Sequence, residues 1–316
     1  MKALIQIAYW LLVILSCAAL SHMRQPLTDM LSNFYLHFTV LGTFLFFFGL
    51  HWRLPRTALV SVAIATICFG LAFSYDRVSV AKDASAVAQQ GKSYRIMTFN
   101  AWEQAKTMTR LKAFLRENQP DFVILQEVTL KDWRALQDIR DLYPFGTYCD
   151  DWLCGVALLS KHKWRTVEAK NFGPHKLPLI TASFPDSLGG LTLLATHSAR
   201  PHWKYSTQRE QFEHLAQHLK ATVKAPVIVG GDMNASVFSS LLRDFAGSSG
   251  LKSAGNFTVT WPQRTRLTGN WYLPILQLDI DHFFVKPGMT LMRKWRGPDL
   301  GSDHRPLLLE FQLPSR

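Results

Sequence analysis

The stretch 227–236, which reads VIVGGDMNAS, decides the fold of this chain. A short apolar run indicates a buried strand, and two glycines followed by polar residues mark the turn at its end. Asp232 and Asn234 stand in that turn, and loops at the edge of a sheet are where functional sites are built. The stretch therefore predicts a sheet whose edge carries polar side chains.

The same pattern recurs at other predicted strand ends along residues 93–316. A single strand-end carboxylate is usually a cap or a solvated turn, but six such clusters are difficult to explain in that way. The clusters are Asn100; Gln126 and Glu127; Thr196 and His197; Asp232 and Asn234; Asp279 and Asp281; and Ser302, Asp303 and His304.

Many short strands with interspersed helices predict two packed sheets that are covered by helices on the outside. The predicted strands are 94–99, 122–125, 155–160, 179–184, 191–195, 227–229, 280–285 and 306–311, and the predicted helices are 106–118 and 207–219. The continuous apolar run at 122–125 is typical of a strand that is buried on both faces.

The residue types in these clusters suit metal-assisted hydrolysis of phosphoesters. The oxygen atoms of Asn100, Glu127 and Asp303 are ligands that a hard cation such as Mg²⁺ or Mn²⁺ prefers. His197 and His304 suit general acid–base chemistry near neutral pH. The sequence contains neither a GxxxxGK[ST] phosphate loop nor a GxSxG elbow, which disfavours nucleotide-driven phosphoryl transfer and serine hydrolysis.

The ordered motifs resemble the endonuclease/exonuclease/phosphatase superfamily, which has the deoxyribonuclease-I-like fold. The resemblance rests on MTFNAW (97–102), DFVILQEV (121–128), GVALLSK (155–161), LLATHS (193–198), VIVGGDMNAS (227–236), LDIDHFFV (278–285) and GSDHRPLLLEF (301–311). The resemblance implies a fold of the α/β class. More specifically, it implies an α+β four-layer sandwich, in which two packed mixed β-sheets are flanked by helices. The apolar runs that precede these motifs and the TWP at 260–262 make the chain similar to the membrane-anchored bacterial YafD-like branch.

The resemblance also implies a role for each motif residue. Glu127 is the principal metal ligand, and Asn100 helps to set the metal site. Asp303 lies at the edge of the metal, and His304 sits beside the scissile phosphate. Asp281, which directly precedes His282-Phe283-Phe284 as in the family, orients His304, whereas Asp279 is expected only to begin the strand.

The remaining motif residues are expected to act on the attacking water and the phosphate. Asp232 positions or deprotonates the water, and Asn234 donates a hydrogen bond to a phosphate oxygen. His197 donates to the phosphate or the leaving group. Deoxyribonuclease I pairs the matching His with a Glu on a preceding strand, and residues 176–179 here supply none. His197 is therefore expected either to act as an acid or simply to bind phosphate.

The composition favours an anionic substrate. The chain has 35 Lys and Arg against 23 Asp and Glu, a net charge of +12, and such a balance is typical of proteins with polyanionic partners. Arg200, Trp102 and Trp261 are predicted to bind substrate, with the indole rings available to stack on bases. A phosphodiesterase or nuclease is the first prediction. The alternative is a phosphatase or phosphodiesterase for lipid head groups or small phosphorylated molecules.

Residues 1–75 are predicted to form a membrane anchor with three transmembrane helices at about 4–20, 34–50 and 57–75. These runs carry no charge, and about 17 to 25 apolar residues span a bilayer core. A signal peptide is the alternative for the first run. Residues 76–92 are small and polar, which predicts a linker, and residues 93–316 are then the catalytic domain.

The flanking cations predict the orientation of this anchor. Lys2, Arg53 and Arg56 flank the ends that the positive-inside rule places in the cytoplasm. The protein is therefore expected in the inner cell membrane as a multi-pass protein, with its catalytic domain on the periplasmic side. Cys149 and Cys154 are candidates for a disulfide there, and two free thiols in a cytoplasmic hairpin are the alternative. No protein partner is predicted.

Overall fold

The computed structural model describes residues 2–21, 25–75, 77–81, 92–102, 105–149, 154–223, 226–263 and 277–313. The chain forms two compact units. Met1–Asp76 clusters with Ala235–Asp244, and Arg77–Asn234 clusters with Phe245–Arg316. The second unit holds the sheets that the sequence predicts.

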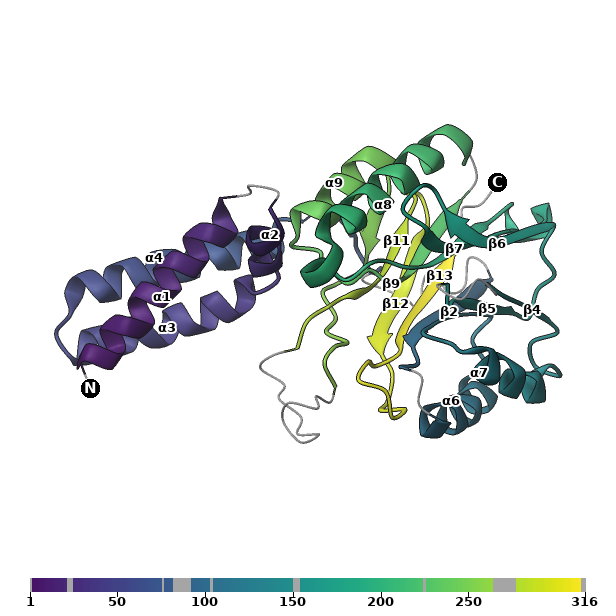
Figure 1. The fold of residues 1–316 in the computed structure, drawn as a ribbon, viewed down its shortest axis with the longest axis horizontal. Coiled ribbons are helices and arrows are strands. Elements are labelled where there is room, and N and C mark those ends of the chain that lie inside the picture. Colours follow the sequence, from purple (N-terminus) through teal and green to yellow (C-terminus); the bar gives the residue numbers. More distant parts are fainter. Residues whose placement is uncertain are drawn as a thin grey trace. The chain divides into compact units, whose positions relative to one another are not determined.

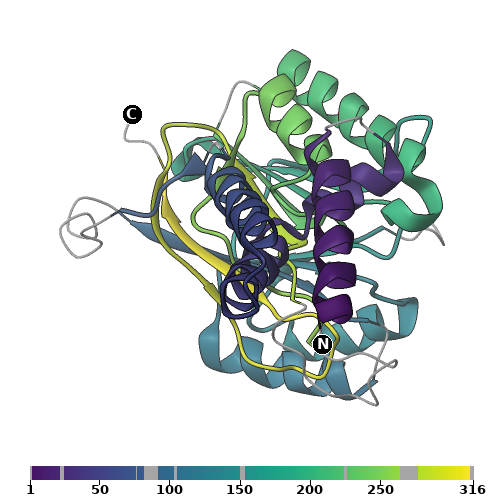
Figure 2. The same cartoon turned by 90° about the vertical axis from the view of Figure 1, so that its left-hand side faces the viewer.

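The N-terminal unit is built from apolar helices. Figures 1 and 2 show α3 (Tyr35–His51) packed against α4 (Pro55–Phe73), with α1 (Lys2–Leu20) alongside α3. Gly42 is needed where α3 meets α4, because a Cβ at that position would lie 2.7 Å from the carbonyl oxygen of Ser61. Small residues of this kind let apolar helices approach closely.

Within the described residues, α1 and α4 are each long and apolar enough to cross a membrane. Helix α3 meets the same test only together with α2 (Pro26–Ser32), from which it is bent by 68°. Length and composition therefore give two candidate spans, or three if the bent pair counts as one. The second predicted span, 34–50, corresponds to α3, and a three-span anchor stays a prediction.

Polar side chains of the N-terminal helices hold the segment Ala235–Asp244 within this unit. Asp29 of α2 is buried and accepts a hydrogen bond from the backbone N–H of Ser240 at 2.6 Å. Asn33 accepts one from the N–H of Ser236 at 3.1 Å. Ser240 begins α9 (Ser240–Ser249), so Asp29 places a carboxylate at a helix N-terminus, where negative charge is stabilising.

The second unit is a sandwich of two mixed sheets with helices on the outside (Figure 1), which confirms the predicted two-sheet architecture. One sheet has the order β1 (Arg77–Val78), β10 (Lys252–Ala254), β11 (Asp281–Val285), β9 (Val227–Asp232), β8 (Thr192–His197), β7 (Leu177–Ser183) and β6 (Thr166–Phe172). The other has the order β12 (Thr290–Arg296), β13 (Leu307–Gln312), β2 (Ser93–Asn100), β3 (Phe122–Gln126), β5 (Ala157–Ser160) and β4 (Phe145–Tyr148). The helices of the second unit are α6 (Ala105–Asn118), α7 (Leu130–Ala135), α8 (Pro201–Thr222) and the end of α9, with the 3₁₀ turns Leu136–Ile139 and Asp186–Leu188.

Alternation along the strands divides the core into layers. Ile96 and Ile124 point into the cluster between the two sheets, together with Phe283 of the opposite sheet. Their strand neighbours Met97 and Leu125 face the other way, into the cluster that α6 and α7 cover. Successive side chains of a strand point to opposite faces, so β2 and β3 are buried on both faces, as the apolar run predicted.

The sheets include strands that the sequence pattern did not predict. Strand β6 lies at the edge of its sheet, and its residues are exposed or only half-buried, so its sequence shows little apolar periodicity. Strand β1 lies within the segment 76–92 that was predicted as a linker and pairs with β10. Residues 82–91 of that segment lie outside the described residues.

The β4–β5 hairpin carries the predicted cysteine pair. The structure joins Cys149 to Cys154 by a disulfide, with their Cα atoms 5.6 Å apart. Both side chains are buried in the core between the sheets. Residues 150–153, which connect them, lie outside the described residues.

Candidate active site

Strand register brings the predicted clusters to one end of the sandwich. The parallel pair β2–β3 sets Asn100 beside Gln126, and the parallel pair β8–β9 sets His197 beside Asp232. The antiparallel strand β11 begins at Asp281, directly opposite Asp232. Since the carboxyl ends of parallel strands meet at one sheet edge, residues far apart in the sequence become neighbours.

Asn100 joins the two sheets at the centre of the site. Its Nδ2 donates to Glu127 Oε1 and to Asp232 Oδ2, both at 3.0 Å. Its Oδ1 accepts the backbone N–H of Trp102 at 3.0 Å, which fixes the amide orientation. Asn100 was predicted to help set a metal site; in this geometry its Nδ2 holds the two carboxylates, and its Oδ1 is bound to the Trp102 N–H.

Asp232 is buried because the chain folds tightly around it. A Cβ on Gly231 would lie 1.9 Å from the carbonyl oxygen of Thr196, so only glycine allows β9 to approach β8 this closely. Asp232 Oδ1 then accepts the backbone N–H of Asn234 at 2.9 Å. Burial raises the pKa of Asp232, and the charge of His304 partly offsets this rise.

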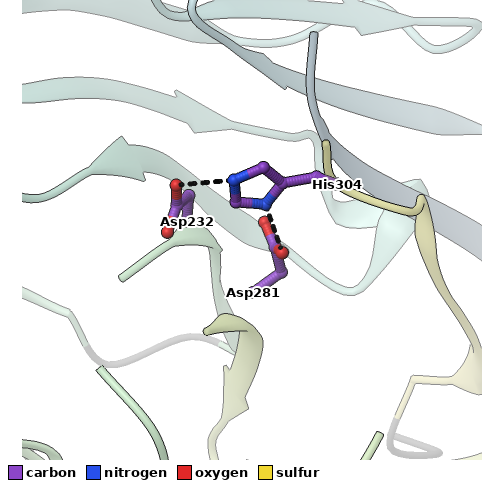
Figure 3. A group of neighbouring side chains, drawn as sticks. All are labelled: Asp232, Asp281 and His304. Atoms are coloured by element: carbon purple, nitrogen blue, oxygen red, sulfur yellow. Dashed lines mark hydrogen bonds and ion pairs between the residues drawn. The ribbon is translucent and has the colours of Figure 1, made fainter. Parts of the chain in front are cut away.

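His304 lies between two buried carboxylates (Figure 3). Its Nδ1 is 2.8 Å from Asp281 Oδ2, and its Nε2 is 3.7 Å from Asp232 Oδ2. Burial alone would lower the pKa of His304, but the charges of Asp281 and Asp232 outweigh burial and raise it to about 10. The imidazole is therefore held as a cation at neutral pH, with its Nε2 directed towards Asp232.

The choice between the two neighbouring aspartates agrees with this geometry. Asp281 contacts His304 directly. Asp279 is also buried, but its charge acts on Lys294. Burial lowers the pKa of Lys294 to about 8, and Asp279 opposes that shift. Within the described residues, Asp281 is the carboxylate that is placed to orient His304.

Glu127 directly follows β3 and has a left-handed backbone, with φ of 51°. Arg200 Nη2 donates to its Oε1 at 2.7 Å, in addition to the bond from Asn100. Burial would raise the pKa of Glu127, but His197, Asn100 and Arg200 together outweigh burial and lower it. Glu127 is thus an ionised carboxylate at the rim of the site. Arg200, which was predicted to bind substrate, is half-exposed beside it.

His197 stands near the same carboxylates but is held less firmly. Its Nε2 is 3.5 Å from Asp232 Oδ2 and 3.9 Å from Glu127 Oε1. This buried nitrogen makes no hydrogen bond to any described residue. On β7 the neighbouring residues are Leu177, Pro178 and Leu179, so this strand offers His197 no carboxylate.

Asp303 and Trp261 form a pair on the opposite side. The indole Nε1 of Trp261 donates to Asp303 Oδ2 at 3.0 Å, and the Trp261 ring lies 6.4 Å from the His304 ring. Burial raises the pKa of Asp303, and the charge of Glu127 adds to the rise although His304 opposes it. Trp261, predicted to stack on substrate, uses its indole nitrogen to orient Asp303.

Asn234, Trp102 and three further residues shape the loops. Asn234 Nδ2 donates to the backbone oxygen of Ser198 at 3.0 Å, and the half-buried Trp102 has a left-handed backbone.

Sequence reasoning gave no role to three residues that hold loop backbone. Ser198 Oγ and Gln208 Nε2 donate to the Met233 carbonyl, and Ser302 Oγ donates to the Asn100 carbonyl. Ser198 directly follows His197, and Ser302 directly precedes Asp303, which was the available signal.

The donor set fits a hard divalent cation at the Glu127 side. Glu127 and Asp303 repel each other electrostatically, and a cation between such carboxylates relieves that repulsion. Asp232, Asp281 and His304 also bring ligand atoms within 4.8 Å of one another. However, His304 Nδ1 and Asp281 Oδ2 already share a hydrogen bond. This second group is therefore better suited to proton chemistry than to holding an ion.

The two-sheet fold is that of the deoxyribonuclease-I-like class of proteins. Residues 97–304 match the model of the Endonuclease/Exonuclease/phosphatase family. The chain belongs to this family, whose members are phosphoester hydrolases that usually depend on divalent metal ions.

Solved structures with low sequence identity share the fold. D. rerio TDP2 complexed with single strand DNA product has a TM-score of 0.59 and 19% identity, covering 70% of this chain and 100% of that chain. The endonuclease/exonuclease/phosphatase from Bacteroides vulgatus has a TM-score of 0.59 and 19% identity, covering 71% and 100%. SmcL has a TM-score of 0.53 and 17% identity, covering 70% and 99%. Comparison with curated protein sequences gives no significant match.

Proposed function

We propose that this protein is a membrane-anchored phosphodiesterase, of the nuclease type, that hydrolyses its substrate by in-line attack of an activated water. The observation that carries the proposal is the buried group Asp232, Asp281 and His304 (Figure 3), which is joined through Asn100 to Glu127. This arrangement supports the assignment of His304 as a cationic donor, Asp232 as a carboxylate base and Glu127 as a metal ligand around one point.

The side chains divide the chemistry between them. His304, held as a cation by Asp281, donates from Nε2 to a phosphate oxygen where negative charge develops. Asp232 orients the attacking water and accepts its proton, and a raised pKa makes it a better base near neutral pH. Glu127 and Asp303 are the proposed ligands of Mg²⁺ or Mn²⁺, which supplies stabilisation of charge on the phosphoryl oxygens when bound.

A nucleic acid is the substrate that the charges favour. The chain has a net charge of +12, and Arg200 is half-exposed at the rim of the site. Positive charge near a site strengthens binding of polyanions. The similar structure of D. rerio TDP2 was solved with a single strand DNA product. Asn234 and His197 are the proposed contacts for phosphate, and Trp102 is the proposed stacking ring.

Lipid head groups are the second candidate substrate. The observation that favours them is the set of apolar helices in the same chain, two of which meet the length and hydropathy requirements of a membrane span. A site tethered to a bilayer encounters phospholipids at high local concentration. The YafD-like branch, with a three-span anchor at residues 1–75 and a catalytic domain from about residue 93, is the proposed placement within the family.

The proposed location is the inner membrane, with the catalytic domain on the periplasmic side. Lys2, Arg53 and Arg56 flank the apolar helices on the sides that face the cytoplasm in this topology. The Cys149–Cys154 disulfide suits an oxidising compartment. Thiol alkylation of intact cells before and after reduction tests this topology: labelling of both cysteines without reductant would contradict it.

Purified full-length protein in detergent tests the activity. Single-stranded oligonucleotide, plasmid DNA, phospholipid vesicles and bis(p-nitrophenyl) phosphate are offered with Mg²⁺, Mn²⁺ or EDTA. We expect metal-dependent cleavage of DNA and of the generic diester, abolished in Glu127→Gln. Cleavage of phospholipid alone would select the second candidate. Activity that EDTA and Glu127→Gln leave unchanged would refute the metal-dependent phosphodiesterase.

A further inference from the structure

The backbone around Glu127 is in a conformation that needs support. Glu127 has φ of 51°, a left-handed value that is strained for a residue with a side chain. Its side chain is held by Asn100 and Arg200. The residues on either side of Glu127 must therefore be fixed if its carboxylate is to point into the site.

The preceding residue is fixed by the site itself. The carbonyl oxygen of Gln126 accepts the backbone N–H of Ala101 at 2.9 Å, which continues the parallel pairing of β2 and β3. The residue after Glu127 is held from elsewhere. Val128 N–H donates to the carbonyl oxygen of Gly155 at 3.0 Å, and Val128 C=O accepts the hydroxyl of Tyr148 at 3.2 Å.

Both partners of Val128 adjoin the disulfide. Tyr148 precedes Cys149, and Gly155 follows Cys154. The two strands of this hairpin also pair between Tyr148 and Ala157, and Cys149 N–H donates to the Val156 carbonyl at 3.0 Å. The disulfide therefore links the chain next to Tyr148 with the chain next to Gly155, the two residues that hydrogen-bond to the C=O and the N–H of Val128.

Gly155 and Tyr148 are shaped for this contact. Gly155 has φ of 57°, a conformation that favours glycine, and a Cβ on it would lie 3.7 to 3.8 Å from the backbone of Glu127 and Val128. The Tyr148 ring stacks on Trp133 of α7, with ring centroids 5.7 Å apart and planes 17° apart. Helix α7 begins directly after this turn, with Thr129 as its N-cap. The hairpin and α7 thus enclose the Glu127 turn from two sides.

We propose that the Cys149–Cys154 disulfide, with Tyr148 and Gly155, positions the metal-ligating Glu127. These are positioning residues: none of them is proposed to touch substrate or metal. The disulfide limits how far the two hairpin strands can separate, and so keeps both hydrogen bonds to Val128 in place. This inference rests on the proposed function, because it assigns Glu127 to a divalent cation.

Metal binding itself is the readout that tests this inference. Binding of Mn²⁺ to full-length protein in detergent is followed by the electron paramagnetic resonance signal of the free ion. Groups that orient a metal ligand typically contribute 10- to 100-fold to metal affinity. The disulfide acts on Glu127 only through Tyr148 and Gly155, so we expect an effect at the lower end of this range. Cys149→Ala/Cys154→Ala should weaken Mn²⁺ binding about tenfold. Tyr148→Phe, which loses one of the two hydrogen bonds, should weaken it about threefold.

Two matched controls separate positioning from general destabilisation. Tyr143→Phe removes a buried hydroxyl that has no hydrogen-bond partner among the described residues, and it should leave Mn²⁺ affinity unchanged. Leu188→Ala creates a cavity in the core between the sheets, so it should lower the melting temperature but not the affinity. Tyr148→Phe keeps the stacked ring, so it should fold even if the double cysteine variant does not.

The outcomes distinguish this inference from the proposed function. If wild type binds Mn²⁺, Glu127→Gln abolishes binding, and the hairpin variants bind as wild type does, the positioning role is refuted while the metal site stands. If Glu127→Gln binds Mn²⁺ as wild type does, the metal site and this inference both fail. Weakened binding in Tyr148→Phe, with unchanged binding in Tyr143→Phe and Leu188→Ala, supports the proposal.

Discussion

The two histidines of the site stand in contrasting surroundings. His304 is buried, and its Nδ1 is bound to Asp281, which fixes both its orientation and its charge. His197 has its Nε2 near Asp232 and Glu127 at 3.5 and 3.9 Å, without a hydrogen bond to any described residue. The His304 ring is held by a hydrogen bond to a carboxylate, whereas the Nε2 of His197 has no such bond to a described residue.

This difference indicates how the catalytic roles are divided between His304 and His197. A donor that is already charged and oriented stabilises a transition state without reorganisation, and this is usually the largest catalytic contribution. Strand β7, which presents Leu177, Pro178 and Leu179 beside His197, supplies no carboxylate that would tune it as an acid. Of the two roles that the sequence left open, phosphate binding is therefore the one that we favour for His197.

The largest effect on catalysis is expected from a change of Asp232, the carboxylate that lies near both His304 and His197. Asp232 lies near both histidines and accepts a hydrogen bond from Asn100. Asp232→Asn should lower kcat/KM by about 10³- to 10⁵-fold, because the water loses its base. Steady-state hydrolysis of bis(p-nitrophenyl) phosphate measures this. The unfolding temperature of the variant is the control, and turnover within tenfold of wild type would remove Asp232 from the mechanism.

The next effect separates the histidine from its orienting partner. His304→Ala should cost about 10³-fold in kcat, whereas Asp281→Asn should cost about 10- to 100-fold, since the aspartate acts only through the imidazole. Asp279→Asn is the matched control, because it changes an equally buried aspartate that is not bound to His304. If Asp279→Asn is the damaging change and Asp281→Asn is silent, the assignment is reversed.

The pH dependence sharpens the same comparison. Asp281 and Asp232 raise the pKa of His304 to about 10 against the effect of burial, so the cation persists until the pH rises through that value. Removing the charge of Asp281 lowers this pKa. The alkaline limb of the kcat/KM profile should therefore move to lower pH in Asp281→Asn. His197→Gln should leave that limb in place, and a shift of equal size in both variants would contradict the asymmetry.

The smallest effects are expected for His197 and Arg200. His197→Gln should lower kcat/KM by about tenfold, and Arg200→Ala by about threefold, mainly through KM, because both residues are proposed to bind substrate phosphate. Arg200 is half-exposed, and exposed charge pairs contribute little. Kinetics with a single-stranded oligonucleotide at two salt concentrations test this. A loss through His197→Gln as large as that through His304→Ala would show that the two sides are equivalent.

The sequence predicted which residues belong to the site more fully than it predicted which of them contact one another. Short apolar strands that end in polar residues identified Asn100, Glu127, His197 and Asp232, because a strand end is a local feature. The two-sheet architecture followed from the number of such strands. The edge strand β6 and the strand β1 were missed, because strands that are exposed or very short show little apolar periodicity.

By itself, the sequence determined which residues can be buried, where strands end, and that apolar helices precede a basic hydrolase-like domain. The family motif predicted Asp281 rather than Asp279 as the partner of His304, and the tertiary structure shows that contact, which depends on strand register between β9 and β11. Only the tertiary structure decided that Asn100 bridges two carboxylates and that the disulfide hairpin adjoins the Glu127 turn. These contacts join residues that are distant in the chain, and local patterns carry no information about which distant residues will meet.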